Sequence, residues 1–213
     1  MIVTDAVSDY LRGLRPAPDP VLAEMEAQGD RDGVPIVVPE VGELLHVLAL
    51  GARARRIVEV GTAIGVSTLY LARALPDDGV IVSFEVDPER HAAARDYLDR
   101  ARVLQRADLR LEDARAGLQS LEPGTFEFAF LDGVKAQYGD YLELVIPLLA
   151  PGGVLASDNV LMSGTVAAGH SDGNWTDGQI EIMRAFTARV LADERLVGTV
   201  TPVGDGVLVA VRR

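Results

Sequence analysis

The sequence has no cysteine in its 213 residues, so disulfide bonds, thiolate metal ligands and cysteine nucleophiles are all excluded. Positive charge is also scarce, because 20 lysines and arginines stand against 32 aspartates and glutamates, for a formal net charge of −12. Such a surface repels a phosphate backbone, and we therefore expect no nucleic-acid partner. The three histidines lie far apart in the sequence, and we assign them no role.

Long uncharged apolar segments are missing too. No stretch reaches the roughly 18 to 20 residues needed to span a bilayer. Asp5 and Asp9 stand where a secretion signal needs a basic start and an unbroken apolar run. We expect a cytoplasmic protein with no membrane partner. The hydrophobic content of 48% suits one domain over residues 1–213, in which residues 1–35 form an N-terminal helical extension.

The spacing of apolar residues predicts the secondary structure. A first helix, ended by a proline cluster, is predicted from Val3, Val7, Tyr10, Leu11 and Leu14, with Pro16, Pro18 and Pro20 after it. Further helices are predicted over 41–50, 67–75, 89–102, about 113–121, 138–149 and 178–192, and strands over 56–60, 80–86, about 109–111, 126–131 and 153–157.

Strands that are apolar throughout and separated by helices indicate an α/β fold with a doubly wound, mostly parallel sheet. The segments GTVTPV and VLVAV, joined by Gly204-Asp205-Gly206, predict a final β-hairpin. We therefore expect seven strands, with an antiparallel strand at the C-terminal end of the chain.

A glycine-rich turn follows the first predicted strand. Gly61 and Gly65 are separated by three residues, unlike the G-x-G-x-x-G spacing of dinucleotide-binding folds. Glycines allow the backbone to approach a ligand closely, while Ser67 and the free amides of the next helix can donate to it. Taken alone, this loop could equally be an ordinary tight turn. Glu85, at the end of the second strand, can accept both hydroxyls of a ribose, and together the two features favour a nucleoside cofactor.

Three oxygen-bearing side chains follow the next strands. Asp132 ends the fourth strand, while Asp158 and Asn159 end the fifth. Because neighbouring strands end at the same edge of a parallel sheet, these side chains should converge near the cofactor. Hard oxygen donors suit Mg²⁺, with Mn²⁺ or Ca²⁺ as substitutes. Helix capping and turn formation are the ordinary alternatives for these residue types.

The pattern E-x-G-x-x-x-G-x-S, followed by the acid after the second strand, resembles class I S-adenosylmethionine (SAM)-dependent methyltransferases. The runs VEVGTAIGVSTLYLA, FLDGVKAQYGDYLE, GGVLASDNVLMSG and PVGDGVLVAV resemble the metal-dependent family that includes catechol and caffeoyl-CoA O-methyltransferases, from about Pro35 to the end. The resemblance implies a Rossmann-like methyltransferase fold, SAM as cofactor, a small hydroxylated, catechol-like acceptor and a homodimer.

The same resemblance implies roles for individual residues. Lys135 completes a D-x-x-K pattern with Asp132 and corresponds to the family's general base. Near a dication and a sulfonium its ammonium form would be disfavoured, which makes the neutral amine accessible. Contacts with the cofactor are implied for Val37, Glu59, Gly61, Thr62, Gly65, Ser67, Glu85, Val86, Ala114 and Asp132. The chemistry requires only an aligned hydroxyl whose pKa a metal lowers.

The chain departs from the family after Asn159. Met162 stands where many relatives have a tryptophan, and Trp175 appears later in the 160–175 loop, which we interpret as a substrate lid. Trp175 could contact substrate or anchor a helix in the core.

Three other functions were weighed. One is a catalytically inactive, SAM- or nucleoside-binding regulatory protein. Another is an NAD-dependent oxidoreductase, which the glycine spacing disfavours, and the third is N-methylation, for which the N-P-P-Y or D-P-P-Y pattern is absent.

Overall fold

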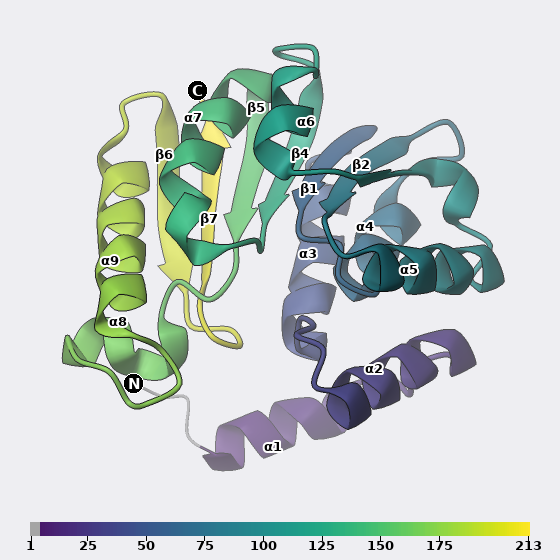
Figure 1. Cartoon of the computed structure of the whole chain (residues 1–213), viewed down its shortest axis with the longest axis horizontal. Helices are drawn as coiled ribbons and strands as arrows, with labels where there is room; N and C mark the ends of the chain where they lie inside the picture. The colour runs from purple at the N-terminus through teal and green to yellow at the C-terminus, as the bar shows by residue number, and fades with distance from the viewer. Residues whose placement is uncertain (1–4) are drawn as a thin grey trace.

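The computed structural model describes residues 5–213, so Val3 of the first predicted helix lies outside the described residues. Seven strands form one sheet in the order β3-β2-β1-β4-β5-β7-β6 (Figure 1). The strands are β1 (Arg56–Val60), β2 (Val80–Glu85), β3 (Ala107–Leu111), β4 (Phe126–Leu131), β5 (Leu149–Ser157), β6 (Leu196–Thr201) and β7 (Val207–Arg212).

The predicted fold class is confirmed by the pairing of these strands. Strands β1 to β5 pair in parallel, whereas β7 is antiparallel to both β5 and β6. Because β7 lies between β5 and β6, the last hairpin forms one side of the sheet and does not continue its parallel order. Since β1 to β5 are parallel, the carboxyl ends of β1, β2, β4 and β5 meet at a single edge of the sheet.

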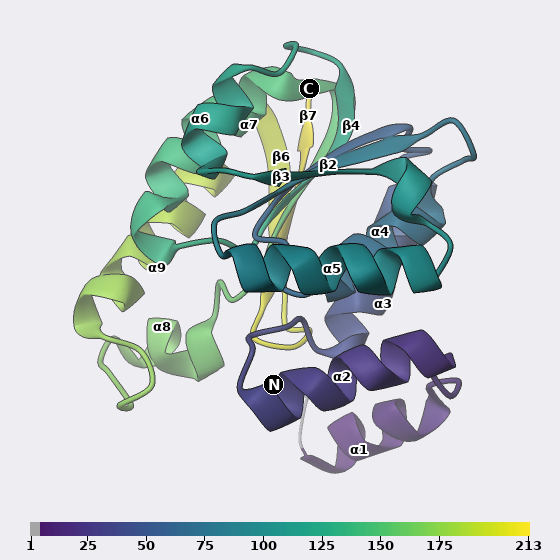
Figure 2. The same cartoon turned by 45° about the vertical axis from the view of Figure 1, so that its right-hand side comes forward.

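Helices cover both faces of the sheet (Figure 2). One face carries α3 (Pro39–Gly51), α4 (Val66–Ala74) and α5 (Pro88–Arg100), and the other carries α6 (Ala114–Gln119), α7 (Tyr138–Leu148) and α9 (Asp177–Ala192). The short helices are η1 (Leu104–Arg106), η2 (Lys135–Gln137), η3 (Met162–Gly164) and α8 (Thr165–Ala168). Among the described residues, no helix combines the length and apolar character needed to cross a membrane.

The hydrophobic core consists of two clusters, one on each face of the sheet. In β1, Val58 and Val60 pack in the cluster with α7 and α9, while Ile57 packs in the cluster with α3 and α4. Successive side chains of a strand point to opposite faces, so a strand buried on both faces is apolar throughout. This explains why continuous apolar runs in the sequence marked these strands.

The N-terminal extension contains two helices, α1 (Asp5–Leu14) and α2 (Pro20–Asp32), of which the sequence analysis delimited only the first. Asp19 caps α2 by accepting from the amides of Val21 and Leu22 at 3.1 and 3.3 Å. Pro20 occupies the first helical position, and Gly33 ends the helix in the left-handed conformation. These are ordinary start and stop signals, but the prolines were interpreted only as the end of α1.

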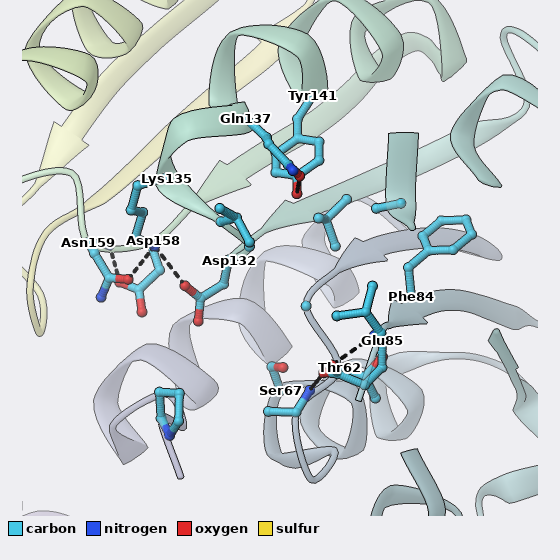
Figure 3. Close-up of a pocket in the computed structure, with 18 of the residues that line it drawn as sticks. Thr62, Ser67, Phe84, Glu85, Asp132, Lys135, Gln137, Tyr141, Asp158 and Asn159 are labelled. Carbon is cyan, nitrogen blue, oxygen red and sulfur yellow. Dashed lines mark hydrogen bonds and ion pairs between the residues drawn. The ribbon is translucent and has the colours of Figure 1, made fainter. Parts of the chain in front are cut away.

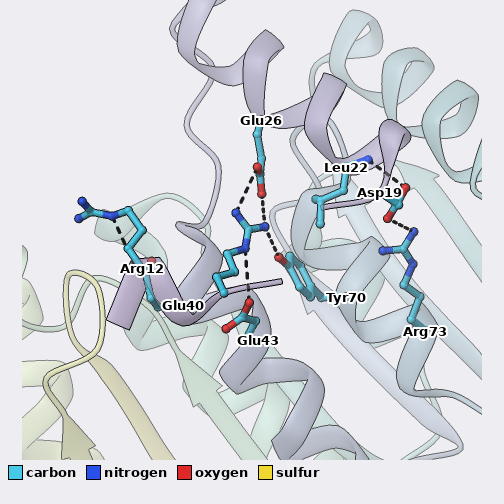
Figure 4. Close-up of polar contacts among 9 residues, drawn as sticks. Arg12, Asp19, Leu22, Glu26, Glu40, Glu43, Tyr70 and Arg73 are labelled. Carbon is cyan, nitrogen blue, oxygen red and sulfur yellow. Dashed lines mark hydrogen bonds and ion pairs between the residues drawn. The ribbon is translucent and has the colours of Figure 1, made fainter. Parts of the chain in front are cut away.

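Arg15, just after α1, attaches the extension to the body of the protein. Its guanidinium donates to Glu26 of α2 at 2.6 Å and to the Tyr70 hydroxyl of α4 at 3.1 Å. Its Nε atom lies 3.4 Å from Glu43 of α3. Figure 4 shows these partners converging from three helices. Since only 14% of the Arg15 side chain is exposed, this cluster is a shielded contact.

Candidate active site

A cavity of about 640 Å³ lies at the carboxyl edge of the sheet. Residues that directly follow β1, β2, β4 and β5 line it, including Gly61, Asp132 and Asp158. Open α/β sheets bind ligands at this edge, where neighbouring helices diverge. Most of the residues that the sequence analysis singled out are therefore brought together around one cavity.

The turn after β1 forms one wall of the cavity. Gly61 and Gly65 have φ values of 97° and 91°, which side chains rarely tolerate. The amides of Gly61 and Thr62 both donate to the Phe84 carbonyl of β2 at 3.1 Å. Thr62 and Ser67 line the cavity, whereas Gly65 packs against Ala94 outside it. The turn is thus fixed by backbone contacts with the next strand.

Glu85 is held rigidly at the end of β2. Its carboxylate accepts from the amides of Ala63, Val86 and Asp87 at 2.8, 2.8 and 2.9 Å. Glu85 and Val86 both line the cavity (Figure 3 labels Glu85). A carboxylate fixed by three amides keeps about one of its roughly four lone-pair sites available for a ligand hydroxyl, in a set orientation.

Glu59 does not line the cavity, in contrast to the prediction that it contacts the cofactor. It is fully buried, and its Oε2 atom accepts from Thr68 and Ser83 at 2.5 and 2.6 Å. Ser83 also shares a hydrogen bond of 2.6 Å with Thr62. Burial raises the pKa of Glu59 to about 7. Glu59 therefore supports the turn from behind, through Ser83 and Thr62.

The remaining predicted cofactor residues lie at two sides of the cavity. Val37 precedes α3 and is 5% exposed. Ala114 begins α6, and Asp113 caps this helix by accepting from the Arg115 amide at 2.8 Å. Val37 and Ala114 both line the cavity, so the structure brings them to the same site as Glu85.

Asp132, Asp158 and Asn159 form a compact oxygen-rich group with Lys135 (Figure 3). The Lys135 ammonium donates to Asp132 at 3.0 Å, to Asn159 at 2.7 Å and to the Tyr138 hydroxyl at 2.8 Å. Asp158 is 3% exposed and accepts from the Asn159 amide at 2.7 Å. Lys135, which is 8% exposed, is the single lysine of the whole sequence.

The charges in this group interact strongly. Burial and the negative charge of Asp132 raise the pKa of Asp158 above its usual value. Burial alone would lower the pKa of Lys135, but Tyr138 and Asp132 outweigh it and raise that pKa. Asp132 and Tyr138 hold Lys135 in the ammonium form. The neutral amine expected beside a dication and a sulfonium stays a prediction.

A second cavity of about 340 Å³ adjoins the first and shares Asp158 and Asn159 with it. Ile36 and Val38 form its apolar wall, and Ser163, Gly204 and Asp205 complete the lining. Asp205, in the β6–β7 turn, accepts from the Ser163 amide at 2.7 Å. The turn therefore fixes the beginning of the 160–175 loop.

The later part of that loop reaches the main cavity. Trp175 and Gln179 line it, whereas Met162 is fully buried in the core and lines neither cavity. Five other polar residues line the two cavities and were not predicted from the sequence: Arg90, Gln137, Tyr141, Gln179 and Asp205. Gln137 and Tyr141 could have been predicted from their position soon after Lys135 in the sequence. Asp205 was interpreted only as a turn residue.

Comparison with known proteins places this chain in a family. Residues 20–213 match the sequence model described as O-methyltransferase. The chain belongs to this O-methyltransferase family. The resemblance and the fold inferred from the sequence are thereby confirmed.

Individual relatives agree with the family match. Catechol O-methyltransferase of Niastella koreensis is 31% identical over 203 residues, covering 93% of this chain and 90% of the relative. Tricin synthase 2 of Oryza sativa subsp. japonica is 36% identical over 177 residues, covering 79% of this chain, and the chain spans only 60% of that relative's length. The crystal structure of the O-methyltransferase TomG from Streptomyces achromogenes in complex with SAM has 29% identity and a TM-score of 0.85, covering 97% of this chain and 96% of that one.

Proposed function

We propose that this O-methyltransferase transfers the methyl group of SAM to one hydroxyl of a small aromatic diol held by a divalent cation. The reaction class, SAM-dependent O-methyl transfer, follows from the family. The observation that carries the finer proposal is the convergence of Asp132, Asp158 and Asn159 beside Lys135 on one cavity.

The residues present fit a divalent cation. Two carboxylates lie near a single ammonium group, and Lys135 donates to Asp132 but has no hydrogen bond or salt bridge with Asp158. Asp158 is therefore a buried carboxylate that forms no salt bridge among the described residues, although the charge of Lys135 acts on it from a greater distance. Hard oxygen donors of this kind suit Mg²⁺, with Mn²⁺ and Ca²⁺ as substitutes. The described residues contain no group of three His, Asp or Glu side chains in metal-binding arrangement, so Asn159 is needed as the third donor.

The cofactor would occupy the rest of the cavity. Glu85 would accept the ribose hydroxyls, and the Gly61 turn with Ser67 would contact the methionine part. Ala114 would lie beside the adenine ring of the cofactor, and Val37 would contact the cofactor from the opposite side of the cavity. This orientation directs the methyl group toward the Asp132 and Asp158 end, where the acceptor hydroxyl must be aligned with it.

The chain's own groups would manage the proton. A bound cation would lower the pKa of an acceptor hydroxyl and fix vicinal oxygens. Lys135 Nζ would take up the hydroxyl proton as a neutral amine, so it would first lose the contact with Asp132 that keeps it charged and release its own proton to solvent. We therefore propose that Lys135 can act as the base only when a cation occupies the metal site and takes over Asp132.

The test is methyl transfer from labelled SAM to a catechol such as caffeate, measured with Mg²⁺ and with EDTA. We expect turnover only with Mg²⁺. Asp158→Ala should bind SAM as the wild type does and lose turnover, because the buried carboxylate serves the metal and not the cofactor. Activity undiminished by EDTA would contradict the role of the metal.

Other expectations from the sequence remain proposals. We propose that residues 1–213 act as a single domain in the cytoplasm. We also propose a homodimer, supported by the 66%, 50% and 62% exposure of Tyr10, Leu11 and Leu14 on α1. Sedimentation of the wild type and of Leu11→Glu would test it, since a dimer formed by α1 should dissociate. The alternative of an inactive nucleoside-binding protein is disfavoured by the presence of Lys135 with all three proposed metal ligands.

A further inference from the structure

Trp175 lies at the end of the cavity that is opposite the proposed nucleoside site. It precedes α9, which packs beside β6 and β7 at one side of the sheet. Glu85 ends β2 and Ala114 follows β3, at the other side of the sheet. Lys135 and Asn159, which follow β4 and β5, line the cavity between these two ends. Trp175 is therefore on the acceptor side.

The backbone around Trp175 is fixed by local hydrogen bonds. The Ser171 hydroxyl donates to the Trp175 carbonyl at 2.6 Å, and the Ser171 amide donates to Asp177 at 2.8 Å. Trp175 is half-buried against the core cluster of α7 and α9, while Asn174 and Thr176 on either side of it are exposed. A half-buried ring that also lines a cavity offers its remaining surface to a ligand.

The two cavities offer little positive charge. Of the described residues that line them, only Arg90 and Lys135 are cationic. Arg90 lies 3.9 Å from Asp87, beside the proposed ribose site, and Lys135 is engaged by Asp132. The second cavity contains Asp158 and Asp205 without any basic residue among its lining. A polyphosphate would therefore meet negative charge without a cationic partner.

We propose that Trp175 provides the aromatic surface against which the acceptor ring packs, and that the acceptor is a small diol with a neutral or cationic side chain, not a coenzyme A thioester. This rests on the proposed function, because it assigns the acceptor of the same site. The indole ring and the Ile36–Val38 wall supply apolar contact, and Asp205 favours a positive side chain. Met162, buried in the core, takes no part in this surface.

The charge preference is tested with ligands that share the 3,4-dihydroxyphenyl ring. We would titrate 3,4-dihydroxyphenylethanol, dopamine and caffeoyl-CoA by calorimetry into the protein with S-adenosylhomocysteine and Mg²⁺. The first two should bind at least about tenfold more tightly than caffeoyl-CoA, because like charges oppose the thioester. Equal or tighter binding of caffeoyl-CoA would overturn the assignment.

Fluorescence locates the bound ring. The sequence contains one tryptophan, so any change in indole emission comes from Trp175 itself. Saturation with 3,4-dihydroxyphenylethanol should shift or quench that emission, with the Kd found by calorimetry. Emission that stays unchanged while calorimetry reports saturation would overturn the contact with Trp175.

Kinetics separate the acceptor from the cofactor. Trp175→Ala should raise the KM for the diol by about fivefold to tenfold, in line with the loss of an aromatic contact and its buried area. Trp175→Phe should raise it much less, and the exposed neighbour Asn174→Ala should match the wild type. An equal rise in the KM for SAM would assign the ring to the cofactor and overturn the proposal.

The proposed function and this inference can fail separately. Absence of methyl transfer to every diol, with Mg²⁺ and SAM present, would remove the proposed reaction. The two binding titrations require no turnover, so calorimetry decides the charge preference and fluorescence decides the contact with Trp175 in either case. Thermal unfolding of Trp175→Ala and Trp175→Phe checks that both variants keep the fold, since Trp175 is partly buried against the core.

Discussion

The backbones of Gly61 and Asp132 are in direct contact, so that a Cβ atom on Gly61 would lie 2.2 Å from the Asp132 carbonyl oxygen. The Asp132 amide in turn donates to the Val60 carbonyl at 2.9 Å. The cofactor turn and the proposed metal ligand are therefore parts of one backbone contact between the ends of β1 and β4. A change on one side must displace the other.

Gly61→Ala should abolish measurable SAM binding and lower the free energy of unfolding by about 2 kcal/mol or more, because φ is 97° and the added carbon meets backbone. Calorimetry with SAM and urea unfolding check the two effects. Gly178→Ala is the matched control, since nothing lies within 4 Å of its added Cβ. Wild-type affinity for SAM in Gly61→Ala would contradict the close approach.

Lys135→Met should increase the affinity for Mg²⁺ by about tenfold, although it lowers turnover. Lys135 donates to oxygens of Asp132 and Asn159, which we assign to the metal, and charged hydrogen bonds of this kind oppose their release. Calorimetric titration with Mg²⁺ measures the change. Lys135→Arg, which keeps the positive charge, should show a smaller gain, and weaker binding in Lys135→Met would mean that lysine and metal do not compete.

Glu59→Gln should remove part of the pH dependence of stability. Burial raises the pKa of Glu59 to about 7 from an ordinary 4.5, so the folded state binds more protons than the unfolded state between these values. The contribution of Glu59 to stability therefore falls as pH rises from about 4.5 through 7, by at most roughly 3 kcal/mol. Urea unfolding at pH 5 and pH 8 should show a smaller loss in Glu59→Gln. Equal losses would show that Glu59 does not titrate in this range.

Arg15→Met should lower the free energy of unfolding by about 1 to 3 kcal/mol, because it leaves Glu26 and Tyr70 without their shielded partner. The exposed pair of Arg12 with Asp9 provides the comparison, with 61% and 71% of the side chains exposed. Arg12→Met should change stability by about 0.5 kcal/mol or less. Similar losses in both variants, measured by urea unfolding, would show that the Arg15 cluster adds nothing beyond a surface ion pair.

Much of the fold could be predicted because its strands are buried on both faces. Strands β1 and β4 were delimited to the residue, since each is a mostly apolar run with a single glutamate, bounded by turn residues that leave little choice of boundary. Helix α2 was missed because its buried residues, Leu22 and Met25, are few and widely spaced among polar ones. Capping signals, not periodicity, mark that helix.

The site was predictable where topology alone positions a residue. Strand ends bring Gly61, Glu85, Asp132 and Asp158 to one edge whatever their side chains do. Glu59 is the last residue but one of β1, so it lies inside the sheet and not at its edge. Its buried carboxyl group is stabilised by hydrogen bonds from Thr68 and Ser83, which belong to other elements. Such three-dimensional partners cannot be deduced from spacing along the chain.

The presence of one lysine in the chain makes the site unusually easy to observe. The other basic side chains are 19 arginines and three histidines, so a protein grown with isotopically labelled lysine would give one side-chain amine resonance, from Lys135. That resonance would respond in turn to SAM, Mg²⁺ and acceptor as each reached the cavity. Spectroscopy of a single nucleus could thus record the order in which the enzyme is assembled for reaction.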